Sequence, residues 1–338
     1  MGKRMALSLL FLAFAALLAA CSAASASLPI IGEKQELKDL GAEQCSGCHG
    51  TYFEEWNKGK HKLSLDTLKK IPSKQNTCLG CMSADGALAA KGKEVTFDNA
   101  QHGVTCLACH LPHGAREGII LRLPKEVLCI SCHTAGKIVP GQGVHHSQKE
   151  MFLGIGGIGV KNMPSQKSRI GVVCIDCHIP TMGKEAIAKV PEDMFDKLQP
   201  RYQGLLKKVD GKYISENLKE RSSHNFKVVL EGPNNSCSKC HPELPVESYR
   251  AIVDGVFADI KVQVDQLEPR MVNMEKVLKA LQDNKIDPGK SLILFNEAKV
   301  NFDLVKNDGS YGFHNYTYAS ALIRVAREKL EQSLAKLP

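Results

Sequence analysis

Apolar residues in the last third of the chain recur every three or four positions, the spacing of one face of an α-helix. This pattern predicts a long amphipathic helix from Val246 to Leu281, kinked at Pro269. Turn residues then set off a second helix, Leu292 to Val305, and a third, Tyr316 to Leu334. We expect residues 246–338 to form an antiparallel bundle whose core contains the apolar stripe. That stripe consists of Ile252, Val256, Ile260, Val264, Leu267, Met271, Met274, Leu278 and Leu281.

Residues 41–245 show no comparable periodicity, and their connections are rich in glycine, proline and lysine. Within this domain, residues 181–236 are polar and irregular and predict a connecting segment. The fold class predicted is therefore mainly α, with extensive loops that precede a C-terminal bundle of long helices. A hydrophobic fraction of 43% and a charged fraction of 24% are ordinary for a globular protein and exclude a disordered or collagen-like chain.

Residues 1–20 have the features of a secretory signal peptide. Lys3 and Arg4 precede an apolar run, Met5 to Ala20, that is short for a membrane span. The run ends in Leu-Ala-Ala before Cys21, which resembles a bacterial lipobox. We expect cleavage before Cys21, lipidation of its thiol, and a linker over residues 21–40. The protein would then be an exported, membrane-anchored lipoprotein, facing the periplasm or at the outer membrane; simple cleavage nearby, giving a soluble product, is the alternative.

Cysteine spacing is the most specific signal in the sequence. Of 13 cysteines, twelve form six Cys-x-x-Cys pairs and Cys21 stands alone. A histidine follows five of these pairs, which is the signature of c-type haem attachment. Zinc ribbons and disulfides do not require that histidine. The five motifs are Cys45, Cys48 and His49; Cys106, Cys109 and His110; Cys129, Cys132 and His133; Cys174, Cys177 and His178; and Cys237, Cys240 and His241.

The spacing has a chemical reason. On one helical turn, two thiols three residues apart can add to the two vinyl groups of a porphyrin, and the next imidazole can bind its iron. We predict five covalently bound haem c groups on this basis. Four of the motifs fall between Cys45 and His178, so we expect the haems themselves to take the place of a side-chain core there.

The sixth pair, Cys78 and Cys81, is followed by Met82 instead of histidine. Three interpretations remain open. A sixth haem attaches here and its iron is bound by Met82 or by a residue from elsewhere. Alternatively, a haem attaches and its iron has no proximal protein ligand, which makes it a reactive centre. In the third interpretation the motif has lost its haem, and the thiols are reduced or disulfide-linked.

The second axial ligands of the five haems must come from the remaining histidines. The chain has 12 histidines, of which five are the proximal ones. Adjacent side chains on a helix point in different directions, so of His145 and His146 we expect one ligand, or one for each of two haems. Between His102 and His113, which flank the second histidine-bearing motif, we expect one ligand and one hydrogen-bond partner. The distal candidates are His61, His102, His113, His145, His146, His224 and His314. We expect the C-terminal bundle to cover the last haem, with His314 presented to it from the turn before the third long helix.

The order of these motifs resembles a known superfamily of multihaem cytochromes c. The resemblance rests on Tyr52, Phe53 and Trp56 before His61, on His145 and His146, and on the Gly-Phe-His-Asn turn at His314 before a long helix. The group includes nitrite reductase, hydroxylamine oxidoreductase and octahaem tetrathionate reductase. The chain is also similar, more weakly, to lipoprotein cytochromes of selenite and tellurite reduction systems. The resemblance implies closely stacked haems and, in some members, one haem with an open distal face; here the atypical position is Met82.

The lead hypothesis is electron transfer along closely spaced bis-histidine haems. The partners expected are other cytochromes or a membrane quinol oxidase, with a homodimer through the C-terminal helices as an option. The alternative is a reductase of a sulfur, nitrogen or selenium oxyanion, acting at a non-standard haem on Cys78 and Cys81. A non-redox haem store is a third, weaker hypothesis. The net charge of +8 comes from lysines spread along the chain, which gives no indication of nucleic-acid binding.

Overall fold

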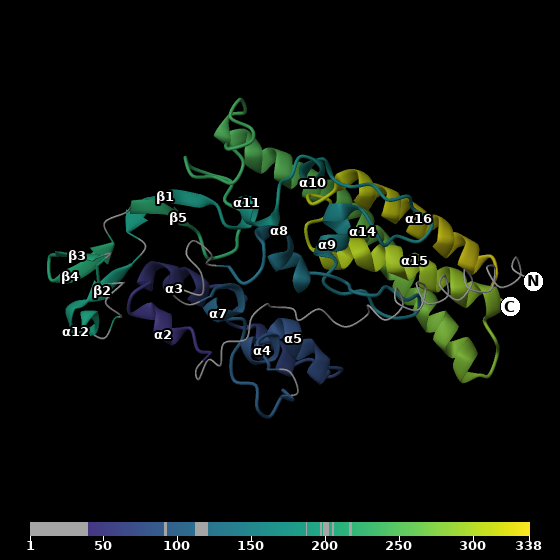
Figure 1. Cartoon of the computed structure of the whole chain (residues 1–338). Helices are drawn as coiled ribbons and strands as arrows, with labels where there is room; N and C mark the ends of the chain where they lie inside the picture. Colours follow the sequence, from purple (N-terminus) through teal and green to yellow (C-terminus); the bar gives the residue numbers. More distant parts are fainter. Residues whose placement is uncertain are drawn as a thin grey trace, which may run out of the picture.

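The computed structural model describes residues 40–338, except 91–92, 112–120, 187, 197, 199–202, 205 and 216–217. Three long helices lie side by side at one end of the molecule, and two small β-sheets lie at the other (Figure 1). The short helices that carry the cysteine motifs lie between these two ends. Within the described residues, no helix has a stretch both long and apolar enough to cross a bilayer.

The three long helices are α14 (Val246–Asp283), α15 (Gly289–Asp308) and α16 (Tyr316–Leu334). Pro269 lies inside α14 and does not end it. The helix α15 stops at Gly309, whose φ of 74° favours glycine. Asn315 caps the start of helix α16, because its side chain accepts a hydrogen bond from the Tyr318 N–H at 3.2 Å. The predicted positions of the three helices therefore agree with the structure to within a few residues.

A single apolar cluster joins these helices. Ile260, Val264 and Leu267 of α14 pack with residues of α15 and α16, and all three are almost fully buried. The cluster extends to Val144 and Met151 from the motif-bearing part of the chain. The C-terminal helices thus have a conventional side-chain core, which stabilises them through burial of apolar area.

Replacing Leu322 with alanine should destabilise this cluster strongly. The side chain is 0% exposed, and a buried leucine-to-alanine change costs about 2–5 kcal/mol of unfolding free energy. Denaturant unfolding followed by far-UV circular dichroism measures the change. Ile293→Ala is the control, because Ile293 is 60% exposed and its replacement should change stability by no more than about 0.5 kcal/mol. Equal losses in the two variants would contradict the assignment of Leu322 to the core.

The motif-bearing part of the chain consists of short helices joined by loops. A second, much smaller apolar cluster is built from Leu65, Leu68, Leu79 and Ala100. The helices are α2 (Glu43–Ser46), α3 (Gly50–Asn57), α4 (Ser64–Lys69), η1 (Asn76–Cys78), α5 (Leu79–Met82), α6 (Ala84–Ala87), α7 (Cys106–Cys109), α8 (Lys125–Leu128), η2 (Cys129–Ser131), α9 (Gln148–Leu153), α10 (Gln166–Arg169), α11 (Cys174–His178) and α12 (Glu192–Phe195).

The expectation that residues 181–236 are irregular is wrong for its first part, which folds into two small antiparallel sheets. In one sheet β1 pairs with β5, and in the other the strand order is β2-β4-β3. Asp210 and Gly211, with φ of 48° and 74°, form the tight turn between β3 and β4. This Asp-Gly pair is the feature of the sequence that could have predicted the hairpin. The strands are β1 (Thr181–Ala186), β2 (Lys189–Pro191), β3 (Leu206–Val209), β4 (Lys212–Ser215) and β5 (Leu218–Ser222).

Hydrogen bonds fix the loops of the motif-bearing part to the C-terminal helices. Ser147 donates its hydroxyl to the Leu304 carbonyl at 2.7 Å. The Gly157 N–H donates to the Tyr318 hydroxyl at 2.7 Å. The Asn301 side chain exchanges two hydrogen bonds with the Ile158 backbone, at 2.7 and 2.9 Å. The two parts of the chain are therefore held in one arrangement.

Candidate haem-binding site

Each histidine-bearing motif forms a single helical turn. In four of them the histidine N–H donates to the carbonyl of the first cysteine at 2.9 Å, and the fifth motif is the helix α11 itself. Residues three and four apart share one face of such a turn, so two thiols and an imidazole lie on the same side. The four histidines with this backbone bond are His49, His110, His133 and His241.

The motifs also meet one another in space. None of the twelve motif cysteines forms a disulfide. A hydrogen bond with Cys45 and burial raise the pKa of the Cys106 thiol. Groups attached to neighbouring motifs would therefore lie close together. The thiol contacts between motifs are Cys45 with Cys106, Cys81 with Cys132, and Cys129 with Cys174.

Three motif histidines face a distal candidate at a nearly constant distance. The ring centroids are 6.1 Å apart for His61 and His133, 5.9 Å for His110 and His224, and 6.2 Å for His178 and His314. An imidazole nitrogen binds a metal ion at about 2 Å, so two imidazoles on opposite sides of one iron have centroids roughly 6 Å apart. The donor sets of these three pairs therefore fit iron held between two histidines.

Hydrogen bonds at Nδ1 orient several of these rings. Nδ1 of His178 lies 3.1 Å from the Phe226 carbonyl, and Nδ1 of His224 lies 3.1 Å from the Ser222 carbonyl. Nδ1 of His314 lies 2.6 Å from Oδ1 of Asp308. A neutral imidazole that donates from Nδ1 keeps the lone pair of Nε2 for a metal. These contacts therefore prepare Nε2 of each ring as the ligand atom.

Burial favours the neutral form of four of the paired imidazoles. Removal from water, together with the nearby His133, lowers the pKa of His61 to about 4. Burial likewise lowers the pKa of His133, His178 and His224. The neutral ring is the form that binds a metal.

Phe226 connects residues of all three histidine pairs. Its ring meets the His61 ring edge-on at 4.4 Å and lies 6.2 Å from the His224 ring, while its carbonyl accepts from His178. Its φ of 59° is unusual for a bulky residue. Such strain persists only where the surroundings impose it, and it clusters at functional sites. Sequence analysis gave no signal for Phe226, because backbone strain is not visible in a sequence.

Two substitutions should separate the packing role of Phe226 from its backbone strain. Phe226→Ala removes the ring contact with His61 and keeps an unfavourable backbone, whereas Phe226→Gly also relieves the strain. We expect the glycine variant to be the more stable by about 1–2 kcal/mol, and both to alter the same low-spin haem signal. Thermal unfolding and electron paramagnetic resonance of the haem-loaded protein measure the two effects. Wild-type spectra in both variants would contradict a contact with a haem ligand.

The other sequence candidates lie in different settings. His49 lies beside Tyr52, with ring centroids 6.3 Å apart. His241 is 59% exposed and lies 3.5 Å from a Glu243 carboxylate oxygen. His145 and His146 are both exposed. His113 and Cys21 fall outside the described residues.

The structure places His314 beside a different motif from the one that we predicted. We expected the long helices to cover the last haem, with His314 presented to it from the turn before α16. The His314 ring instead faces His178 of the fourth histidine-bearing motif, at 6.2 Å. The reason is that Asp308, at the end of α15, and Ser310, in the turn that follows, hold His314 on that side through its ring and backbone nitrogens.

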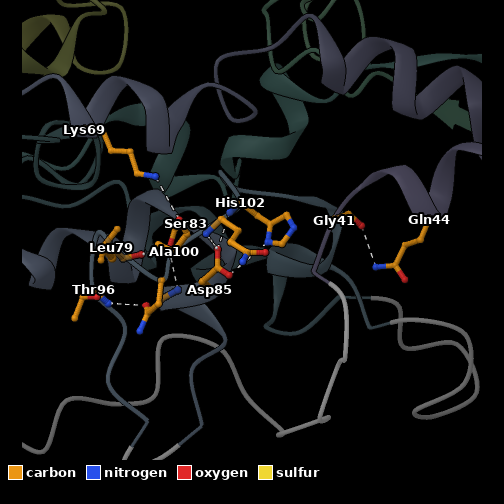
Figure 2. Close-up of polar contacts among 12 residues, drawn as sticks. Gly41, Gln44, Lys69, Leu79, Ser83, Asp85, Thr96, Ala100 and His102 are labelled. Atoms are coloured by element: carbon orange, nitrogen blue, oxygen red, sulfur yellow. Dashed lines mark hydrogen bonds and ion pairs between the residues drawn. The ribbon is translucent and has the colours of Figure 1, made fainter.

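The segment around Cys78 and Cys81 differs from the other motifs. The side chain of Met82 packs against the small apolar cluster, and its carbonyl accepts from the Ser64 hydroxyl at 2.8 Å. Figure 2 shows His102 next to this segment, held by Asp85. Oδ2 of Asp85 accepts the His102 N–H at 2.8 Å, and Oδ1 lies 3.4 Å from Nδ1. Met82 is therefore a packed side chain in this structure, and His102 is the histidine beside the motif.

Comparisons with known proteins indicate the same cofactor as the attachment motifs. The family model "Doubled CXXCH motif" matches residues 99–138. Multiheme cytochrome MtrA of Shewanella baltica (strain OS185) is 26% identical over 157 residues, which cover 44% of this chain and 46% of MtrA. The Outer Cell Wall Cytochrome OcwA is 31% identical with a TM-score of 0.59, over 82% of this chain and 49% of OcwA.

A weaker structural match is the cytochrome c nitrite reductase of Desulfovibrio desulfuricans ATCC 27774. It has 14% identity and a TM-score of 0.49, over 82% of this chain and 70% of the reductase. The aligned regions span about half the length of MtrA and of OcwA. The attachment motifs, the matched family model and the likeness to multihaem cytochromes identify the chain as a multihaem c-type cytochrome that binds haem covalently.

Proposed function

We propose that this cytochrome transfers electrons through haems held between two histidines each. The observation that carries the proposal is the set of three histidine pairs with ring centroids 5.9–6.2 Å apart. Haem iron bound there supplies one-electron chemistry between its ferric and ferrous states. Two imidazoles on one iron leave no coordination position for a substrate. Paired histidines therefore favour an electron carrier over an enzyme with its own substrate site.

The arrangement of the motifs supports a continuous route for electrons between the attached haems. Cys45 contacts Cys106, and Cys129 contacts Cys174, so successive attachment points lie side by side. His241, of the last motif, is 59% exposed, whereas His178 of the preceding motif is half-buried. We therefore assign the last motif to the surface at which a redox partner exchanges electrons with the chain. The partner would be another cytochrome or a membrane quinol oxidase.

The haem number and the cellular site belong to the same proposal. We propose five haem c groups, one for each motif that ends in histidine. We also propose export, with Cys21 as a lipid anchor in a membrane that faces the periplasm or in the outer membrane, and a homodimer through the C-terminal helices as an open option. The matched proteins support only the coarser view that such cytochromes are extracellular or periplasmic.

A second function is favoured by one observation at Cys78 and Cys81. The side chain of Met82 is packed into an apolar cluster, so a haem attached here would lack the proximal ligand of its own motif. Cys81 contacts Cys132, which would bring electrons to it from a neighbouring motif. Such a haem would have an open face and could reduce a sulfur, nitrogen or selenium oxyanion.

Counting haems per chain and recording the oxidised spectrum tests both functions. For the electron carrier we expect five haems and a spectrum dominated by low-spin iron, because imidazole pairs give low-spin haem. A double Cys78→Ser and Cys81→Ser variant should then retain all five haems. Six haems with a high-spin fraction that this variant abolishes, together with turnover of nitrite or tetrathionate, would instead establish the reductase.

A further inference from the structure

Asp308 is a fully buried carboxylate in direct contact with a proposed haem ligand. Its side chain is 0% exposed, and Oδ1 lies 2.6 Å from Nδ1 of His314. Oδ2 accepts hydrogen bonds from the Ser310 hydroxyl and, at 3.3 Å, from the Ser310 N–H. Ser310 Oγ in turn accepts the His314 N–H at 3.0 Å. The three residues thus form a closed hydrogen-bonded unit between α15 and α16.

The hydrogen-bond acceptor of the His314 ring is charged, whereas the acceptors of the His178 and His224 rings are neutral. His178 and His224 each donate from Nδ1 to a neutral backbone carbonyl at 3.1 Å. His314 donates to a carboxylate at a shorter distance, 2.6 Å, as is typical of a charge-assisted hydrogen bond. Since Asp308 is buried, neither water nor salt screens its charge effectively. A carboxylate acceptor also increases the basicity of a metal-binding imidazole.

We propose that Asp308 is a positioning residue that gives His314 anionic character and thereby lowers the reduction potential of the haem bound by His178 and His314. This inference rests on the proposed function, in which these two histidines share one iron. A more electron-donating ligand stabilises the ferric state over the ferrous state. The site attached at Cys174 and Cys177 is therefore set to a lower potential than its two imidazoles alone would give.

Two features near Asp308 change the local electrostatic potential in opposite directions. Asp308 is the last residue of α15, where the helix dipole adds further negative potential. Lys167 opposes this effect, because its ammonium group donates to the Phe313 carbonyl at 2.5 Å and lies 4.2 Å from the centre of the Phe313 ring. Both influences stay in place when only Asp308 or Ser310 is changed. A difference in potential between variants therefore reports the carboxylate.

Two substitutions should move the potential in opposite directions. In Asp308→Asn the amide oxygen still accepts from His314 but carries no charge, so the potential of one haem should rise. A tenfold change in the ratio of reduced to oxidised haem at a fixed electrode potential corresponds to about 59 mV for one electron, and we expect at least that. Ser310→Ala removes a donor from Oδ2 and concentrates the negative charge on His314, so the same haem should shift to lower potential.

The measurement is a redox titration of the fully haem-loaded protein, followed by optical and electron paramagnetic resonance spectra. Asp308→Glu should restore a low potential, because it keeps the charge. Asp303→Asn is the matched control, since Asp303 is a buried carboxylate of the same helix whose partner is Lys299 at 3.6 Å. Its potentials should equal those of the wild type. The low-spin haem count should stay unchanged in all these variants.

Failure of this inference can be told apart from failure of the proposed function. If His314→Ala leaves every haem low-spin, the assignment of His178 and His314 to one iron is wrong. If His314→Ala produces one high-spin haem while Asp308→Asn leaves all potentials unchanged, the role of Asp308 alone is overturned. Shifts of equal sign in Asp308→Asn and Ser310→Ala would also overturn it, because loosening of the turn would then explain both.

Discussion

Replacing His61 with alanine is expected to convert one low-spin haem per chain into a high-spin haem. The His61 ring faces His133 with centroids 6.1 Å apart, and a methyl group cannot bind iron in its place. The haem attached at Cys129 and Cys132 would keep only its proximal ligand. His224→Ala should do the same to the haem attached at Cys106 and Cys109, since His224 faces His110 at 5.9 Å.

The spin change is measured in the oxidised protein by optical and electron paramagnetic resonance spectra, with haem content determined in parallel. The double variant of His61 and His224 should show two high-spin equivalents, because the two pairs serve different motifs. Imidazole added to the solution should restore low-spin iron by occupying the space left by the side chain. Haem attachment itself should be unchanged, because both thioether positions are intact.

His145→Ala provides the matched control. His145 is an exposed histidine of the same polypeptide and has none of the close ring pairings seen for His61, His224 and His314 within the described residues. Its spectrum should be that of the wild type. A wild-type spectrum in His61→Ala would show that the ring pairs do not correspond to ligand pairs.

Features that depend on residues close together in the sequence were predicted correctly, whereas features that depend on distant residues were not. The long helices were predictable because each depends on a local repeat of apolar residues and on stop signals such as Gly309. The five attachment motifs were predictable because thiols and imidazole must lie within one turn. Both are properties of neighbouring residues, which a single sequence records directly.

The pairing of ligands was not predictable from the sequence. His61 and His133, like His178 and His314, come from distant segments whose approach depends on the packing of the whole chain. The His314 turn was assigned to the wrong motif for this reason. In the sequence Asp308 stands out only as the residue before the helix-stopping Gly309, although its carboxylate contacts the His314 ring. Residues that act on a ligand through space leave no local spacing signal.

Preparation of the chain without haem should unfold residues 40–245 and leave α14, α15 and α16 largely helical. The reason is the unequal distribution of apolar burial. The large cluster joins the three long helices through residues such as Ile260, Leu304 and Leu322, all 0% exposed. Within its described residues, the motif-bearing part has one small apolar cluster of its own, around Leu65, Leu68 and Leu79, and adds Val144 and Met151 to the large one. Each fully buried side chain contributes only about 1.5–3 kcal/mol.

Expression without a haem-maturation system supplies the haem-free chain, and limited proteolysis with mass spectrometry locates the protected residues. We expect rapid cleavage before Val246 and a protected fragment that contains the long helices, together with the loss of helical circular dichroism from the short helices. The haem-loaded chain, digested in parallel, should resist cleavage in both parts. Equal protection of residues 40–245 in the two forms would show that side-chain packing alone maintains the motif-bearing part, and that haem is not its structural core. Protection of this part only in the loaded form would instead mean that its fold depends on the attached haems, as the sparse apolar burial around Leu65 requires.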